Sequence, residues 1–226
     1  MVEILVGMAI ALLGILVITQ VSTNFEAQKR STTGGDSANN TGAIALFQMQ
    51  RDLRHAGYGF SRVNVLGCDL TVSGRVLTNI APIVINPAEI TGADAGTDSL
   101  LVTYGSGNGT PDGDGITAQP STGVYAVQTY VSFKVGDKVI ATPKTKASPC
   151  TGGSGLIVDQ VTAVTAASTS ISVQTGVAGM TNGVVYNLGQ TVRAVGYAVR
   201  GGALTQCDFV TTACATASNW IPIAND

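Results

Sequence analysis

The sequence has few charged residues, few aromatic residues and a single histidine. Charged side chains make up 12% of the 226 residues and aromatic side chains 5%, whereas glycine occurs 28 times. Little charge together with many small and β-branched residues favours β-strands joined by turns. The formal net charge is only −2, so the chain as a whole carries no basic field of the kind that attracts nucleic acid.

The same scarcity limits the chemistry of the chain. No pattern of catalytic residues accompanies the one histidine, His55, so a Ser/His/Asp set cannot be built. The cysteines include no C-x-x-C pair, whereas a structural zinc site needs about four closely spaced nitrogen or sulfur ligands. The glycine-rich segments 105–107 and 152–155 lack the Lys-Ser/Thr tail of a phosphate loop. We therefore expect no enzymatic activity, no zinc site and no cofactor.

One segment, residues 108–115, has the composition of a metal-binding loop. Its oxygen-bearing residues alternate with glycines, which suits a hard cation such as calcium, and Asp112 and Asp114 are the candidate ligands. The acidic residue that closes an EF-hand loop is absent, because Gln119 stands at the twelfth place counted from Asn108. A Gly/Asp turn is the simpler interpretation, so we predict no metal at this segment.

The cysteines predict a disulfide framework. There are four, Cys68, Cys150, Cys207 and Cys214, and four cysteines allow three pairings. Cys207 and Cys214 bracket a short loop and form the natural local pair, which leaves Cys68 and Cys150 as a long-range pair. An even number of cysteines behind an export-type anchor fits an oxidising compartment. Four buried free thiols are the alternative.

Hydrophobic residues are concentrated at the N-terminus. The uncharged run 4–22 has nearly the ~20 residues that a helix needs to span a bilayer. A cleaved secretory signal has a basic residue before the run and a small-residue cleavage site after it, and neither is evident here. Instead, Glu3 stands at the front edge of the run. The carboxylate either complements the helix N-terminus at the headgroup level or pairs with a positive group of a neighbouring subunit, and the bare apolar N-terminus favours the second.

A polar segment, residues 23–41, follows the apolar run. It contains two adjacent glycines and two adjacent asparagines, which weaken a helix. We therefore expect a break near residues 33–41 within a stem that continues to residue 58.

An amphipathic pattern returns after this polar segment. An apolar stripe with helical spacing predicts a face that packs on a sheet, and its members are Gly42, Ala45, Leu46, Met49, Leu53 and Ala56. The pattern directs Gln48, Arg51 and Arg54 away from this face. Ile44 and Phe47 lie off the stripe and are available to other subunits.

From residue 61 onward the hydrophobic period changes to two. Turns rich in Gly, Asp, Asn and Pro separate nine predicted strands, at 75–77, 83–85, 99–104, 124–133, 138–141, 156–164, 170–173, 184–187 and 191–199. We expect no long helix after Tyr58. The predicted fold class is α+β, with a hydrophobic helix at 1–22, the rest of the stem at 23–58 and a mostly antiparallel β head at 59–226.

The N-terminus resembles that of a known superfamily. Residues 1–6 (MVEILV) and the apolar helix after them are similar to the processed N-terminus of type IV pilins and pseudopilins. In that superfamily a dedicated peptidase removes a short basic leader. The resemblance maps the family's glutamate onto Glu3 and implies that it neutralises the N-terminal amine of an adjacent subunit. Only two residues precede Glu3 where the family has four, so we expect the mature N-terminus to lie two residues upstream.

A second segment, residues 51–58 (RDLRHAGY), resembles the end of the stem helix in the PilW-like minor pilin family. Gly57 is interpreted as the stop of the helix, and His55 as a surface residue that complements the helix dipole. Weaker similarities in 98–105, 135–162, 192–204 and 220–224 extend the resemblance over nearly the whole chain. Family members continue with another strand, so we expect either more chain beyond residue 226 or a strand supplied by a second polypeptide.

The resemblance implies a pilin-like fold and a structural subunit of a type IV pilus-like filament. Its partners would be copies of itself, other pilins, a prepilin peptidase and the pilus assembly machinery. The subunit would reside in the inner membrane before assembly and then in an extracellular filament of a bacterium. The expected assembly residues are Glu3, Ile4, Leu5, Leu12, Leu13 and Leu16. Fibre-forming and minor or priming roles both fit. The alternatives are a membrane-anchored monomeric adhesin or binding module, and a pseudopilin of type II secretion.

Overall fold

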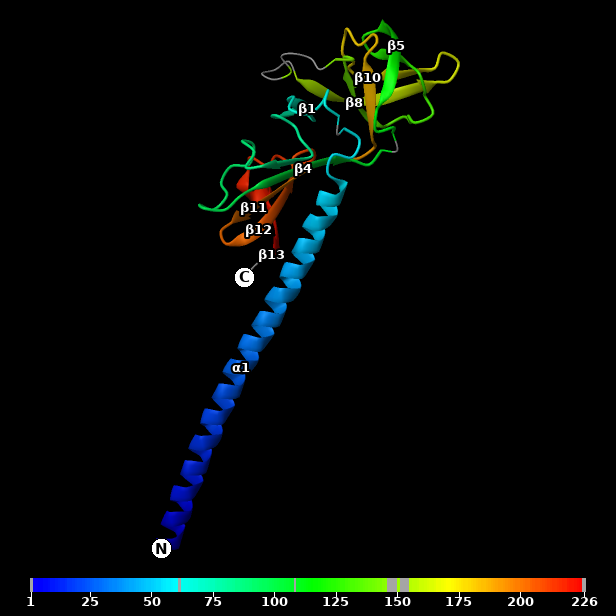
Figure 1. Ribbon diagram of the computed structural model, residues 1–226. Helices are drawn as coiled ribbons and strands as arrows, with labels where there is room; N and C mark the ends of the chain where they lie inside the picture. Colours follow the sequence, from blue (N-terminus) through cyan, green and yellow to red (C-terminus); the bar gives the residue numbers. More distant parts are fainter. Residues whose placement is uncertain (1, 61, 108, 146–149, 151–154, 225–226) are drawn as a thin grey trace.

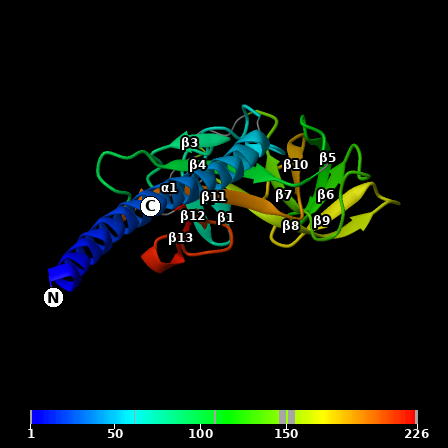
Figure 2. The same ribbon diagram turned by 90° about the horizontal axis from the view of Figure 1, so that it is seen from below.

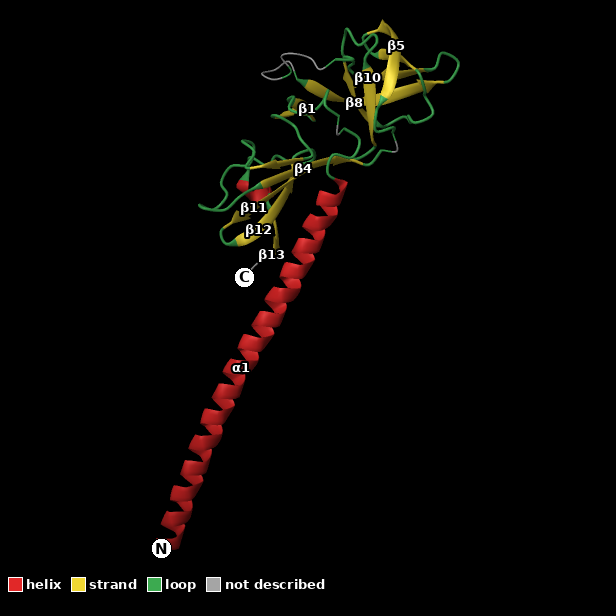
Figure 3. Ribbon diagram, in the orientation of Figure 1, coloured by secondary structure: helices red, strands yellow, loops and turns green. Residues whose placement is uncertain are grey.

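The computed structural model describes residues 2–60, 62–107, 109–145, 150 and 155–224. Over these residues the chain forms the helix α1 (Val2–His55), thirteen strands and the short 3-10 helix η1 (Ala217–Asn219). The strands are β1 (Leu70–Val72), β2 (Arg75–Leu77), β3 (Ile83–Ile85), β4 (Leu100–Gly105), β5 (Asp114–Ser121), β6 (Val124–Val127), β7 (Lys138–Thr142), β8 (Leu156–Thr165), β9 (Ser170–Val173), β10 (Val184–Gly189), β11 (Val192–Arg200), β12 (Ala203–Asp208) and β13 (Ile221–Ala224). Figure 3 shows that the helix and the strands occupy separate parts of the molecule.

The helix α1 is a single continuous rod that projects from the β-rich head (Figure 1). Its 54 residues correspond to a length of about 81 Å. The break predicted near residues 33–41 is not observed, because all of these residues are helical. A glycine weakens a helix by about 1 kcal/mol but removes no backbone hydrogen bond. Continuing an existing helix also avoids the cost of a new nucleus.

The helix ends earlier than predicted, at His55 and not at residue 58. Gly57, the predicted stop, has a positive φ of 77°, a conformation that glycine adopts without a steric penalty. Its N–H donates to the carbonyl of Thr103 at 2.9 Å, so the chain leaves the helix and is fixed at once to strand β4.

A five-stranded antiparallel sheet lies beside the C-terminal part of the helix. Its strand order is β13-β12-β11-β4-β3. Figure 2 shows the helix crossing the face of this sheet. Val102, Val195 and Tyr197 form a buried cluster, against which Met49 and Leu53 of the helix pack. The sheet therefore covers one face of the last turns of α1.

A second sheet contains a closed ring of strands. The six strands β5 to β10 pair in the order β5-β6-β9-β8-β7-β10, and β10 pairs back with β5. The buried side chains of this barrel include Tyr125, Phe133, Ile171 and Val185. Its strands all lie between β4 and β11 in the chain, and Figure 1 places it at the end of the head far from the N-terminus. The two-stranded hairpin β1–β2 joins it through a parallel pairing of β1 with β8.

Two disulfides connect these parts. Cys68, just before β1, is bonded to Cys150 in the connection between β7 and β8, with a Cα–Cα distance of 4.9 Å. Cys207 in β12 is bonded to Cys214, with a Cα–Cα distance of 5.9 Å. These are the two pairs expected from the sequence, and neither leaves a free thiol. The chain is thus an α+β protein with a long apolar N-terminal helix and mostly antiparallel sheets.

Candidate assembly surface

The N-terminal part of α1 is covered by none of the residues that the structure describes. Every residue from 2 to 40, which we call the free stem, is exposed. This segment includes Glu3, in the first turn of the helix. The five apolar assembly residues predicted from the sequence are 57–69% exposed, and they are Ile4, Leu5, Leu12, Leu13 and Leu16.

These apolar residues do not share one face. At ~100° per residue, Leu5, Leu12 and Leu16 lie on one side, while Ile4 and Leu13 lie about 100° and 80° away from Leu5 in opposite directions. A helix that is apolar all round is stable only when it is covered on every side, by a membrane or by other helices. Among the described residues, α1 is the one helix long and apolar enough to span a bilayer. Such a helix near the N-terminus fits membrane anchoring or a signal sequence.

The C-terminal part of α1, residues 41–55, is anchored to the head, and we call it the anchored stem. The predicted apolar stripe forms this contact in large part, since Ala45 is buried and Gly42, Met49, Leu53 and Ala56 are half-buried. Leu46 differs from the prediction because it is 64% exposed. It lies about 100° around the helix from Ala45, beyond the reach of the sheet. Ile44 and Phe47 are exposed, as predicted.

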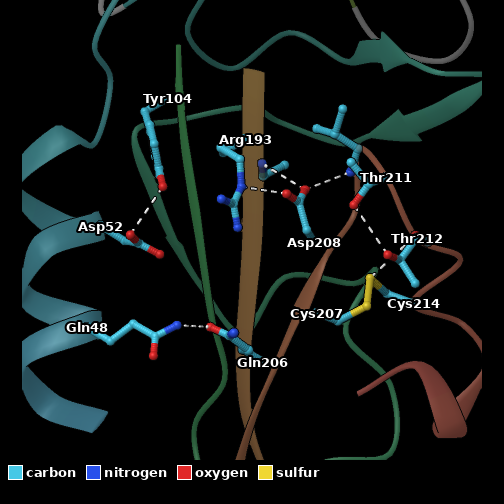
Figure 4. A network of polar contacts seen from close by, with 12 residues as sticks. Gln48, Asp52, Tyr104, Arg193, Gln206, Cys207, Asp208, Thr211, Thr212 and Cys214 are labelled. Carbon is cyan, nitrogen blue, oxygen red and sulfur yellow. Dashed lines mark hydrogen bonds and ion pairs between the residues drawn. A yellow bond between two sulfur atoms is a disulfide. The ribbon is translucent and has the colours of Figure 1, made fainter. Parts of the chain in front are cut away.

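Asp52 is the buried polar residue of the anchored stem, with 2% of its surface exposed. It accepts hydrogen bonds from the hydroxyl groups of Tyr104 at 3.1 Å and Tyr197 at 2.7 Å. Figure 4 shows its carboxylate directed from the helix toward β4. Burial, together with the adjacent Asp52 carboxylate, raises the pKa of both tyrosines, so each remains a donor at neutral pH. Asp52 therefore fixes the helix to two central strands of the sheet.

Asp52 was not among the residues predicted from the sequence, although its position on the helix indicates burial. Positions 45, 49, 52 and 56 follow the i, i+4, i+7, i+11 pattern of one helix face. A carboxylate on a packing face requires hydrogen-bonding partners. The prediction for Gln48 was wrong, because its amide donates to Gln206 of β12 at 2.7 Å. The polar side chains on this face thus bind to the head.

Polar contacts continue into the sheet beyond the helix (Figure 4). Arg193 of β11 forms an ion pair with Asp208 of β12 at 2.6 Å. Asp208 also accepts from the backbone N–H of Val210 at 3.0 Å. Its neighbour Cys207 carries one of the disulfides. These contacts link β11 to β12 and to the turn that follows it.

An open hollow lies where the helix meets the head. Its volume is about 760 Å³, and its lining includes Arg51, His55, Tyr58, Tyr104 and Arg193. His55 is exposed, as predicted. Its Nδ1 lies 2.8 Å from the Arg51 carbonyl, and its ring centroid lies 5.7 Å from that of Tyr104. The hollow thus combines two guanidinium groups with two phenol rings.

The candidate calcium segment has other contacts. Asp112 forms an ion pair with Arg62, and Asp114 is buried and accepts a hydrogen bond from Ser132 at 2.9 Å. Asn108, the first residue of that segment, lies outside the described residues. The two carboxylates therefore have separate protein partners.

Neither a family model, nor a curated protein, nor a solved structure matches this chain. The chain is therefore described by its structure alone, as an α+β protein with two disulfides and a long apolar N-terminal helix.

Proposed function

We propose that this chain is a pilin-like, non-enzymatic structural subunit of a type IV pilus-like extracellular filament. The subunit resides in the inner membrane, and its free stem then packs among the stems of other copies or other pilins. One observation carries the proposal: a long helix with a carboxylate in its first turn and an apolar run at residues 4–22 projects from a disulfide-bonded β head, and every residue of its free stem is exposed.

A membrane alone leaves part of the exposed helix unexplained. The free stem from residue 2 to residue 40 is about 58 Å long, whereas the hydrocarbon core of a bilayer is about 30 Å thick. Ile44 and Phe47 are 66% and 69% exposed. They lie about 33 Å or more beyond Ser22 along the helix, so a bilayer around residues 4–22 does not cover them. Neighbouring subunits in a helical bundle would cover the apolar run and also Ile44 and Phe47.

Glu3 gives this bundle a specific contact. A lone carboxylate at the front of an apolar run is costly in a dry environment unless it meets a positive group. The resemblance described above assigns that positive group to the N-terminal amine of an adjacent subunit. Within a dry core of packed stems, such an ion pair is much stronger than in water, and it would fix how neighbouring copies are placed along the filament axis.

The test is to shear filaments from producing cells and to quantify this polypeptide in the sheared and membrane fractions by mass spectrometry. We expect the wild-type chain in sheared filaments and the Glu3→Ala variant only in the membrane fraction. Glu26→Ala, which removes an exposed stem carboxylate outside the apolar run, is the matched control and should assemble normally.

The relative amount of the chain distinguishes its roles. A dominant share of the sheared material identifies a fibre-forming subunit, and a trace share beside another pilin identifies a minor or priming subunit. A wild-type chain found only in the membrane fraction, with Glu3 dispensable, would replace the proposal with a membrane-anchored monomeric adhesin or binding module. Recovery together with a type II secretion apparatus would identify a pseudopilin.

A further inference from the structure

The hollow at the junction of helix and head has an excess of positive charge on its open side. The side chains of Arg51 and Arg193 are 57% and 38% exposed. The carboxylates that pair with them face inward, because the side chains of Asp52 and Asp208 are only 3% and 12% exposed. None of the described residues that line the hollow is acidic. Two partly exposed guanidinium groups thus border a space of about 760 Å³.

Besides Glu3 in its first turn, the free stem carries one acidic residue that has no basic partner nearby on the helix. Glu26 is followed by Lys29 and Arg30, which are its i+3 and i+4 neighbours and compensate its charge. Asp36 has no lysine or arginine within four positions on either side, and it is exposed. It lies about 21 Å beyond Ser22 along the helix, so its carboxylate is outside a bilayer that surrounds residues 4–22.

Asp36 cannot reach the hollow of its own chain. It lies 15 positions (51 − 36) before Arg51 on the same straight helix, a separation of about 22 Å, whereas an ion pair requires about 4 Å or less. We propose that Asp36 inserts into the hollow at Arg51 and Arg193 of a second copy of this chain. The arginine fork matches a carboxylate in geometry, and Tyr58 and Tyr104 border the same space.

This contact rests on the proposed function, because it requires parallel stems of several copies. It places the two copies about 22 Å apart along their common axis. Their apolar runs, each about 28 Å long, then overlap by only about 6 Å. The contact therefore joins more distant copies along the filament than those linked through Glu3, and it adds an ionic, salt-sensitive component to an apolar bundle.

Charge reversal tests the pairing. Asp36→Arg should lower the yield of sheared filaments at least fivefold, because two positive groups would then face each other. Adding Arg51→Glu to this variant should restore at least half of the wild-type yield. Glu26→Arg is the matched control, with the same change of charge on the same stem, and should leave the yield within twofold of the wild type. Normal filaments from Asp36→Arg, or no recovery in the double variant, would overturn the inference.

A crosslink tests proximity directly. The four native cysteines are bonded in pairs, and the ~22 Å between positions 36 and 51 of one chain is much longer than an arginine side chain. Filaments carrying Asp36→Cys and Arg51→Cys should therefore yield covalently linked dimers and longer oligomers with a short bifunctional maleimide, which spans the length of the replaced arginine side chain. The control pair, Ala38→Cys with Arg51→Cys, places the first thiol ~200° around the helix and should yield none. Equal crosslinking by both pairs would refute the contact.

The outcomes separate the two proposals. Absence of wild-type filaments removes the proposed function, and this inference with it. If filaments require Glu3 but form normally after Asp36→Arg, the proposed function stands and only the contact at the hollow is refuted.

Discussion

Residues 2–40 and 41–55 belong to one helix, but within the described part of the chain only the second segment is covered by other residues. The free stem is exposed throughout. The anchored stem contributes Ala45 and Asp52 to the buried interior of the molecule. The first segment therefore adds nothing to the buried interior described here, whereas the second is part of the fold of the head. Substitutions of Glu3 and Asp36 in the free stem should change assembly, and substitutions in the head and the anchored stem should change unfolding.

The largest effect on unfolding is expected from the long-range disulfide. Cys68 and Cys150 are separated by 82 positions, and Cys207 and Cys214 by 7. Loop-closure entropy predicts a cost of about 4–5 kcal/mol for replacing the first pair by alanine and about 2–2.5 kcal/mol for the second. The measurement is chemical denaturation of the full chain in detergent micelles, followed by the fluorescence of the single tryptophan, Trp220. Equal losses for the two pairs would contradict the prediction.

The boundary between the two segments is tested by Asp52→Ala. This change leaves the hydroxyl groups of Tyr104 and Tyr197 without their acceptor inside the interface. We expect a loss of about 2–3 kcal/mol in the same denaturation experiment. Asp36→Ala removes a carboxylate from the free stem and is the control, with no change in the unfolding of the head. If Asp52→Ala left the free energy of unfolding unchanged, the anchored stem would be held by apolar packing alone.

Two carboxylates of the head should have opposite effects on its stability when they are ionised. Burial raises the pKa of Asp114 above its usual value, so ionisation at neutral pH opposes folding, and Asp114→Asn should stabilise the head at pH 7 but not near pH 3. Hydrogen bonds from the backbone N–H groups of Gly202 and Gly201 lower the pKa of Asp94. The Asp94 carboxylate therefore contributes to the free energy of unfolding at pH 7, and this contribution is lost as the pH falls through that lowered pKa.

Denaturation of the two variants at pH 7 and pH 3 checks these signs. Asp94→Asn should destabilise the head at pH 7, and this deficit should shrink as the wild-type carboxyl is protonated. Shifts of the same sign in both variants would show that the two environments do not differ as described.

The smallest effect on the head is expected from the glycines of the free stem. A Cβ atom at Gly34 or Gly35 would meet nothing within 4 Å. Alanine at each position should stabilise the helix by about 1 kcal/mol and leave the unfolding of the head unchanged. Circular dichroism should show equal or greater helix content, and Trp220 fluorescence an unshifted midpoint. A shift of that midpoint would mean that the free stem and the head unfold together.

Local signals in the sequence predicted much of the fold. The apolar run, the helix stop at Gly57 and the nine strand positions all correspond to elements of the structure, although the strand predicted at 124–133 ends at Val127. Strands β1, β5, β12 and β13 were missing from the predicted strands. β5 begins at Asp114 in the Gly/Asp segment interpreted as a turn, and it also contains Pro120. Its pairing with β6 and β10 overrides these local preferences.

The closed barrel and the attachment of the stem depend on contacts between distant parts of the sequence. Closure of the barrel requires β10 to return to β5, and no local pattern specifies that partner. The bonds of Asp52 to Tyr104 and Tyr197 span 52 and 145 positions. The spacing of the helix face could have placed Asp52 in the interface, but the identity of its partners requires the register of β4 against β11.

The position of the barrel in the chain has a consequence for how such a molecule can diverge. Gly105, the last residue of β4, lies directly opposite Val192, the first residue of β11, so the barrel begins and ends at adjacent points of the five-stranded sheet. An insertion whose two ends are neighbours can be lengthened, shortened or exchanged without altering the register of the strands that carry it. The barrel is held to the rest of the head also by β1, by one disulfide and by the buried cluster that Phe60 and Ile80 share with Ile140 and Leu188. An exchanged tip would therefore have to keep the apolar face that meets this cluster.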